Sequence, residues 1–155
     1  MCRRLLRSSL NRASFDSLIL SLVTGHVVVR VGEIMTIDIQ MRLVEGAAVL
    51  YPGPYLNQLR GEGIERRCRE LLASGIRQIV INFAETELIN SIGISILLGV
   101  IEAVNEARGT LVLSNLAQSN RELFEMLGLL SHVRIESSEA AALSSLCDKL
   151  QSTAI

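Results

Sequence analysis

The sequence has few aromatic residues and no excess of charge of either sign. Tryptophan is absent, three phenylalanines and two tyrosines make up the aromatic 3%, and the formal net charge is −1. A core must therefore be built from aliphatic side chains, and 155 residues predict one domain large enough to bury it. A near-neutral chain gives no case for nucleic-acid binding, which usually needs a basic face.

Cysteine and histidine are too scarce and too scattered to indicate a metal or redox site. Cys2, Cys68 and Cys147 have no C-x-x-C spacing, and neither His26 nor His132 has a ligand-spaced partner. A glycine-rich phosphate loop, a G-x-S-x-G motif and an H-E-x-x-H motif are also missing from the sequence. We therefore expect no enzyme, no catalytic residue, no cofactor and no metal. An odd number of cysteines is typical of a protein in the reducing cytoplasm.

Residues 1–34 differ in composition from the rest of the chain. The first part is basic, and residues 15–31 are largely apolar. Charged residues interrupt the apolar stretch, so it does not resemble a membrane span, and no clear cleavage site for a signal peptide follows it. Three interpretations stay open: a weak targeting segment, a disordered N-terminal extension, or a start codon assigned too far upstream of Met35. We expect the folded domain to span residues 35–152.

Hydrophobic periodicity predicts strands and helices that alternate after an opening hairpin. Short apolar or alternating runs indicate five strands, at residues 37–44, 47–51, 78–83, 110–114 and 133–136. Apolar residues at helical spacing indicate four helices, at residues 56–74, 91–108, 120–127 and 139–150. We expect the first strand to be half-buried, and Ser119 and Ser138 to cap the last two helices. This order predicts an α/β fold with one mixed sheet of about five strands and a helical layer.

A single serine, Ser91, stands where a buried strand gives way to a long apolar helix. Helix N-termini carry unpaired N–H groups and a partial positive charge, and Asn90 can cap this one. A phosphate on Ser91 would therefore lie in a ready-made anion site. No histidine base is recognisable beside it, and a serine without a base is a poor nucleophile. The junction favours a phosphorylation switch over a catalytic centre, and a simple helix cap is the alternative.

The order of the elements and the motif Asn90-Ser91-Ile92-Gly93-Ile94-Ser95 resemble the STAS family, which includes bacterial anti-sigma factor antagonists. The resemblance covers about residues 36–150. It implies that Ser91 is the phosphorylated serine and that Gly93 is the family glycine. The turn Pro54-Tyr55-Leu56-Asn57 stands where the family has a second motif.

The chain departs from the family pattern at three positions. Both family aspartates are asparagines, Asn57 and Asn90, and the second Ser/Thr of the motif is Ile92. An asparagine still caps a helix as well as an aspartate does, but it supplies no negative charge. If the family kinase needs that carboxylate, phosphorylation of Ser91 is slow or absent. The protein would then be a permanently competent antagonist or a scaffold-type STAS protein.

The predicted helix 91–108 is apolar over most of its circumference, which indicates either burial or cover by a partner. Gly99 inside this helix costs roughly 1 kcal/mol relative to alanine, so we expect a close approach by another molecule there. For Asn57, turn chemistry is an equal alternative to partner contact. We expect the partner to contact Asn57, Asn90, Ile92, Gly93, Ser95, Leu98, Gly99 and Glu102.

The resemblance implies a partner-switching mechanism. The unphosphorylated protein would bind an anti-sigma factor that is also a serine-protein kinase of the GHKL type, and phosphorylation of Ser91 would release it. The kinase brings ATP, so this chain needs no cofactor. We expect a cytoplasmic monomer or weak dimer that binds no nucleic acid and spans no membrane. The alternative is a scaffold-type STAS module of a stressosome-like or lipid-transport complex that is not phosphorylated.

Overall fold

A computed structural model describes residues 37–152, and the expectations for residues 1–34 lie outside this range. In chain order the elements are β1 (Gln40–Val44), β2 (Ala47–Tyr51), β3 (Tyr55–Leu56), α2 (Gln58–Ala73), β4 (Gln78–Asn82), β5 (Leu88–Ile89), α3 (Ser91–Glu106), β6 (Thr110–Ser114), α4 (Gln118–Met126), a 3-10 turn (Leu129–Ser131), β7 (Arg134–Glu136) and α5 (Glu139–Ser152). The main sheet has the order β1-β2-β4-β6-β7, with β1 antiparallel to β2 and the other pairs parallel. The predicted α/β fold with a mixed five-stranded sheet and four helices is confirmed.

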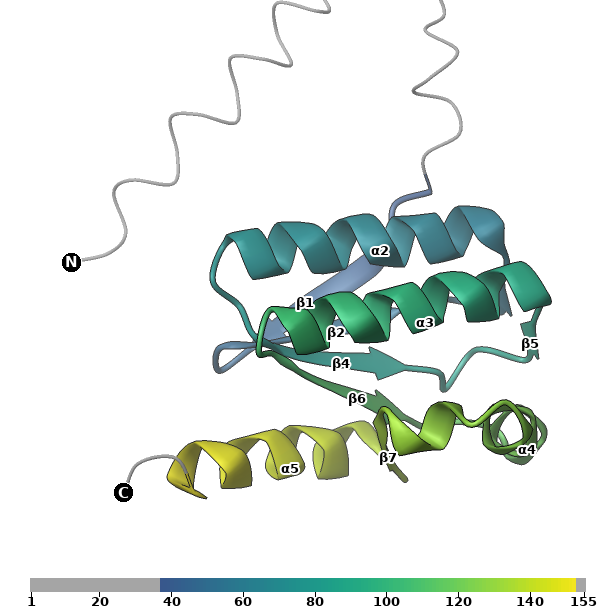
Figure 1. Cartoon of the computed structure of the whole chain (residues 1–155). Helices are drawn as coiled ribbons and strands as arrows, with labels where there is room; N and C mark the ends of the chain where they lie inside the picture. Colours follow the sequence, from purple (N-terminus) through teal and green to yellow (C-terminus); the bar gives the residue numbers. More distant parts are fainter. Residues whose placement is uncertain (1–36, 153–155) are drawn as a thin grey trace, which may run out of the picture. The chain divides into compact units, whose positions relative to one another are not determined.

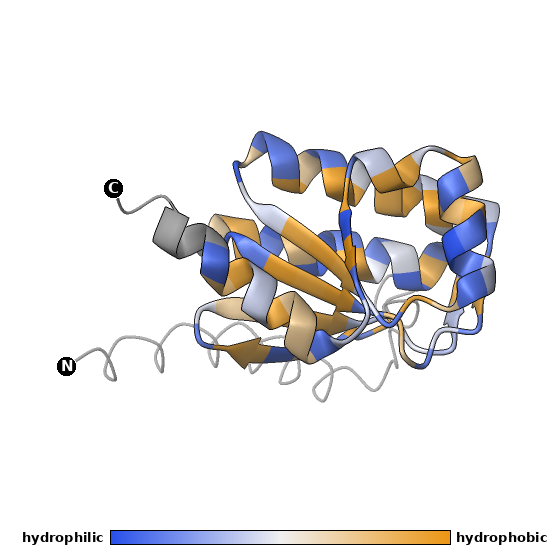
Figure 2. Ribbon diagram, turned by 90° about the horizontal axis from the view of Figure 1, so that it is seen from below, coloured by the Kyte–Doolittle hydropathy of each residue, from blue (hydrophilic) through white to orange (hydrophobic). Residues whose placement is uncertain are grey.

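Helices cover both faces of the sheet. Figure 1 shows α2 and α3 side by side over one face and α5 along the other, with α4 near the end where α3 begins. The central strands β4 and β6 are almost continuously apolar and buried, as strands covered on both faces must be. Figure 2 shows the same strands as hydrophobic bands between the helices. Two apolar clusters result, a larger one under α2 and α3 and a smaller one under α5.

Close packing against α2 accounts for part of the apolar circumference of α3. A Cβ atom at Gly61 of α2 would lie 3.0 Å from the Cδ1 atom of Ile96 of α3, so the missing side chain lets the two helices approach. On the sheet side, Leu97 and Val100 are buried in the larger core. Helix α3 therefore uses two of its faces for packing within the chain, which leaves a narrower exposed edge.

A second, two-stranded parallel sheet was not predicted from the sequence. In it β3 pairs with β5, with Tyr55 opposite Leu88 and Leu56 opposite Ile89. Each strand has two residues, too few for any periodicity to indicate a strand. This small sheet joins the segments that lead into α2 and α3, so it fixes the two helix starts relative to each other.

Two local predictions were wrong. Helix α4 begins at Gln118 rather than after Ser119, and its N-cap residue, Ala117, offers no side-chain hydrogen bond. Strand β1 begins at Gln40 and is largely exposed rather than half-buried, because it is the outermost strand of the sheet. The side chain of Leu43, for example, is 59% exposed. By contrast, Ser138 does cap α5, since its Oγ accepts a hydrogen bond from the N–H of Ala141 at 3.1 Å.

Candidate functional site

The starts of α2 and α3 lie together at the carboxyl end of the parallel strands. Both helices follow directly from the small β3–β5 sheet, and the Asn90 N–H donates a hydrogen bond of 3.1 Å to the carbonyl of Leu56. Figure 1 shows the two helices running in the same direction from this end. Carboxyl ends of parallel strands are where α/β proteins commonly place their sites. Two sets of free helix N–H groups therefore share one end of the molecule.

Ser91 is the first residue of α3, and Asn90 is its cap. The Oδ1 atom of Asn90 accepts a hydrogen bond from the Gly93 N–H at 2.8 Å. The Ser91 hydroxyl is therefore not the capping group, and the side chain is exposed. The structure separates two functions that the sequence left combined, because Asn90 holds the helix start and Ser91 presents a hydroxyl to solvent.

Gly93 is buried, and its role is to let two backbones meet. A Cβ atom at this position would lie 2.5 Å from the carbonyl oxygen of Leu56, a distance that no side chain tolerates without movement of the backbone. The residue expected to contact a partner is therefore covered by the chain itself. It positions Ser91, two residues earlier, against the segment that leads into α2.

Asn57 caps α2 in the same way that Asn90 caps α3. Its Oδ1 atom accepts a hydrogen bond from the Arg60 N–H at 3.1 Å. The two asparagines that the resemblance implies stand at aspartate positions are thus the caps of two adjacent helices. A further contact joins the two starts, because the Asn90 Nδ2 atom donates to the hydroxyl of Tyr55 at 3.3 Å. Neither helix carries an acidic residue in its first turn.

Exposed apolar side chains lie next to Ser91 in the chain and in the small sheet. Leu88 is 64% exposed, Ile92 is 48% exposed and Tyr55 is 42% exposed. Leu88 and Tyr55 face each other in the β3–β5 pairing, and Ile92 directly follows Ser91. Large apolar groups exposed together are typical of a protein-binding surface. We refer to Tyr55, Leu88, Ser91 and Ile92 as the Ser91 surface.

The remaining predicted contact residues follow the exposed edge of α3. Ser95, Gly99 and Glu102 are exposed, whereas Leu98 is partly buried against the core. Apart from its chain neighbours and the nearby backbone of α3 itself, no described atom lies within 4 Å of the position that a Cβ atom of Gly99 would occupy. The expected close approach at Gly99 is therefore not made by residues 37–152, and the position is open on its outer side.

Sequence reasoning missed Leu88 as a surface residue. The residue belongs to an apolar pair, Leu88-Ile89, that directly precedes the motif at Asn90. In a two-residue strand the side chains point to opposite sides, so one of them is turned away from the core. Ile89 packs inward and Leu88 points outward. The signal was present in the sequence, but only the pairing with β3 decides which of the two residues is exposed.

Beyond the serine, other features of the described residues bear on function: a cysteine thiol, the arrangement of metal-ligating side chains and the length of the helices. Burial raises the pKa of the Cys68 thiol to about 12, so this cysteine stays protonated and unreactive. Within the described range no three His, Cys, Asp or Glu side chains gather into a possible metal site. Nor does any helix of this part of the chain have the length and apolar character needed to cross a membrane.

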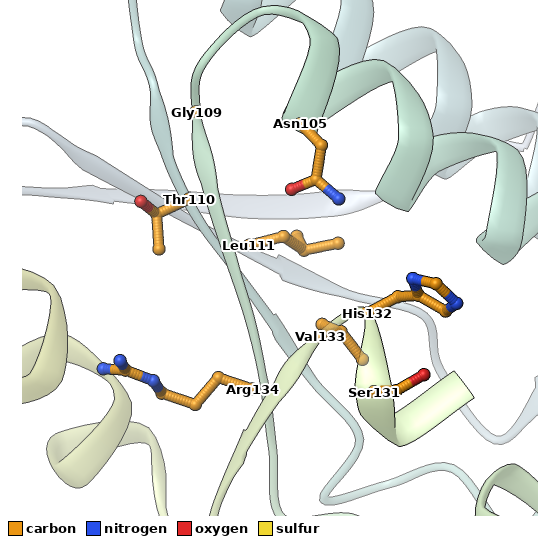
Figure 3. A pocket seen from close by; sticks show the side chains of 8 residues that line it. All are labelled: Asn105, Gly109, Thr110, Leu111, Ser131, His132, Val133 and Arg134. Atoms are coloured by element: carbon orange, nitrogen blue, oxygen red, sulfur yellow. The ribbon is translucent and has the colours of Figure 1, made fainter. Parts of the chain in front are cut away.

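A cleft of about 410 Å³ lies at the opposite end of the sheet, where β6 and β7 begin. It is lined by Asn105, Gly109, Thr110, Leu111, Ser131, His132, Val133 and Arg134. Figure 3 shows the Asn105 and His132 side chains on one side of β6 and the Arg134 side chain on the other. The His132 imidazole is thus at the amino end of the strands, and Ser91 is at their carboxyl end, so His132 cannot serve Ser91 as a base.

Comparison with known proteins gives one family and a consistent group of relatives. The family model described as the STAS domain matches residues 38–142. The Bordetella bronchiseptica protein BtrV, provisionally named an anti-sigma factor antagonist, is 28% identical over 102 residues, which cover 66% of this chain and 88% of that protein. An anti-sigma factor antagonist from Mycobacterium paratuberculosis has a similar structure, with a TM-score of 0.63 at 18% identity, over 74% of this chain and 97% of that one.

The phosphorylated form of the Bacillus cell fate determinant SpoIIAA also has a similar structure, with a TM-score of 0.56 at 20% identity. The match covers 73% of this chain and 99% of that one. At such identities the two solved structures show a shared fold and no more.

Proposed function

The chain belongs to the STAS domain family, and we propose that it is an anti-sigma factor antagonist whose binding is controlled by phosphorylation of Ser91. One observation carries the proposal. Ser91 is exposed at the first position of a helix whose cap is a different residue, and the exposed apolar side chains of Ile92 and Leu88 come directly after it and three residues before it. The name of the BtrV relative supports the same class of function.

In this proposal the Ser91 surface binds an anti-sigma factor that is also a serine kinase of the GHKL type. The unphosphorylated surface is uncharged and partly apolar, which suits burial against a protein. A phosphate on Ser91 adds about −1.5 to −2 charges at pH 7. Burying that charge among Tyr55, Leu88 and Ile92 would be costly, so the complex dissociates and the anti-sigma factor returns to its sigma factor.

Paired baits test this proposal. Full-length wild type, Ser91→Ala and Ser91→Asp proteins are used to capture partners from the native cell extract. We expect wild type and Ser91→Ala to retain a serine kinase, identified by mass spectrometry, and Ser91→Asp to lose it. Ser144→Asp is the matched control, because Ser144 is an exposed serine on α5. Equal capture by all four proteins would contradict control at Ser91.

The two asparagine caps favour a second candidate, a scaffold-type STAS module that is never phosphorylated. Because Asn57 and Asn90 are neutral, no carboxylate beside Ser91 comes from these two positions. Intact-mass spectrometry of the native protein separates the candidates. Phosphate on Ser91 supports the switch, whereas its absence after incubation with the captured kinase and ATP, together with large oligomers on gel filtration, supports the scaffold.

A further inference from the structure

A polar network lies on the face of the sheet that α5 covers, opposite α2 and α3. At its centre is the Glu139 carboxylate, on the first residue of α5. It accepts hydrogen bonds from the Nδ2 atom of Asn82 at 2.6 Å and from the hydroxyl of Tyr51 at 2.9 Å, and it pairs with Arg42 of β1. The network therefore joins α5 to three strands of the sheet, and its residues come from segments up to 97 positions apart.

The Glu139 carboxylate is held in its charged form. Burial by itself would raise its pKa, but hydrogen bonds from Asn82 and Tyr51 and the charge of Arg42 together lower the pKa below its ordinary value. A place in the first turn of a helix also favours a negative charge. Glu139 therefore acts as a permanent hydrogen-bond acceptor at neutral pH.

Asn82 connects this acceptor to the segment that leads to Ser91. Its side chain is buried, with 7% of the residue exposed. While Nδ2 donates to Glu139, Oδ1 accepts from the N–H of Ala84 and from the Nδ2 atom of Asn115, both at 2.9 Å. An amide has one accepting end and one donating end, so the acceptor at Glu139 and the donors at Ala84 and Asn115 favour the same orientation, in which Oδ1 faces Ala84.

Ala84 is the second residue of the connection that runs from β4 to Ser91. Further along the loop, the hydroxyl of buried Thr86 donates to the carbonyl of Gly53 at 2.8 Å, and the Glu87 N–H donates to the carbonyl of Pro54 at 2.9 Å. The loop is thus anchored near its start through Asn82 and through the Phe83 N–H, which donates to the carbonyl of Ser114 at 2.9 Å, and further along on the segment before α2. Among these anchors, the one through Asn82 is tied to α5, because Asn82 donates to Glu139.

We infer that Glu139 and Asn82 are positioning residues for the Ser91 surface, acting from the opposite face of the sheet through the Ala84 N–H. The inference rests on the proposed function, because it concerns how the surface around Ser91 is held for its partner. Without the carboxylate, the buried Asn82 amide loses one of the three partners that hold its orientation, and its donating end is left without the acceptor at Glu139. The loop then samples other conformations at Ala84, and the partner meets a less ordered surface.

Amide hydrogen exchange of the full chain, followed by NMR, tests the positioning directly. In Glu139→Ala we expect the Ala84 amide to exchange at least tenfold faster, while the amides of Ile79 to Ile81 in β4 keep their wild-type rates. Glu139→Gln retains an acceptor for Asn82 and should stay within threefold of wild type. Asn82→Ala provides a second variant should Glu139→Ala fold poorly. Glu70→Ala, which removes an exposed ion pair on α2, is the matched control.

Binding to the captured anti-sigma factor forms the second part of the test. Glu139→Ala should weaken binding about tenfold, and Glu139→Gln should restore it. The inference is overturned if the Ala84 amide of Glu139→Ala exchanges at the wild-type rate, or if exchange becomes faster at all amides together. Local acceleration with unchanged affinity overturns it too, because the loop would then have no bearing on the partner. If the wild type binds no anti-sigma factor, the proposed function fails, and the exchange rates alone decide whether Glu139 positions the loop.

Discussion

The starts of α3 and α5 both contain a serine, but the serine has a different position in each. At α5, Ser138 is the cap and the acidic Glu139 follows it. At α3, Asn90 is the cap and the neutral Ser91 follows it. Both helix starts favour a negative charge, because their free N–H groups carry a partial positive charge. The start of α5 has its own carboxylate, whereas the start of α3 has no acidic residue in its first turn.

This difference separates a structural helix start from one suited to regulation. The Glu139 carboxylate is tied to Arg42, Tyr51 and Asn82, so its charge contributes continuously to the fold. Ser91 is exposed and can gain a charge only by modification. A substitution at one helix start, compared with a matched reference, tests this difference.

The largest effect is expected from Gly93→Ala at the start of α3. The new methyl group would meet the Leu56 carbonyl oxygen at 2.5 Å, and we expect a loss of about 2–3 kcal/mol in the free energy of unfolding. Gly99→Ala in the same helix is the reference. Outside the nearby backbone of α3 itself, no described atom lies within 4 Å of its Cβ position, so better helix propensity should stabilise the protein by roughly 1 kcal/mol. Urea unfolding measures both, and equal effects would contradict the close approach at Gly93.

Removal of a cap should have the next largest effect. Asn90→Ala and Asn57→Ala each delete one side-chain hydrogen bond to a helix N–H, at a cost of about 1 kcal/mol in unfolding free energy. Although the two variants should be similarly stable, we expect Asn90→Ala to weaken partner binding more, because Ser91 directly follows it. Isothermal titration with the captured partner tests this, and equal losses of affinity would remove the distinction between the two starts.

Restoring the family aspartates should change stability less. Asn90→Asp and Asn57→Asp keep the cap and add a charge that the helix N-terminus favours by roughly 0.3–1 kcal/mol. If the kinase needs a carboxylate beside its target, Ser91 is phosphorylated faster in Asn90→Asp than in wild type, whereas Asn57→Asp leaves the rate unchanged. Initial rates with the captured kinase and ATP decide the matter. A rate unchanged by Asn90→Asp would show that the neutral cap is no obstacle.

The smallest effect concerns the pH dependence of the α5 start. Because the pKa of Glu139 is lower in the folded state than its ordinary value of 4.5, its charge stabilises the native state above that pH. This contribution is lost as the pH falls through the folded-state pKa. Wild type should therefore lose stability between neutral and acidic pH more steeply than Glu139→Gln. The difference should be modest, since Arg42 is exposed and solvent screens the pair.

Urea unfolding of both proteins across this range provides the measurement. Parallel curves would show that Glu139 does not titrate with a lowered pKa. Ser91→Asp offers the converse comparison at α3, since it adds a carboxylate to a first turn that has no acidic residue of its own.

Several features of this protein were determined by the sequence alone. The apolar run 78–83 predicts a buried strand, and helical spacing predicts α3 within two residues of its observed end. Asn90 before Ser91 and Ser138 before Glu139 are local capping signals, and both act as caps. Such features follow from residues close in the chain, because periodicity and capping involve only neighbours within one or two turns.

The tertiary structure decided what these elements do for one another. Gly93 is buried because the Leu56 carbonyl, 37 positions away, approaches it, and Leu88 is exposed because β5 pairs with β3. Glu139 reaches Asn82 across 57 positions, which no local pattern encodes. Contacts of this range depend on how strands and helices are brought together in space. The sequence therefore located the serine, whereas the fold determined which side chains surround it and which hold its loop in place.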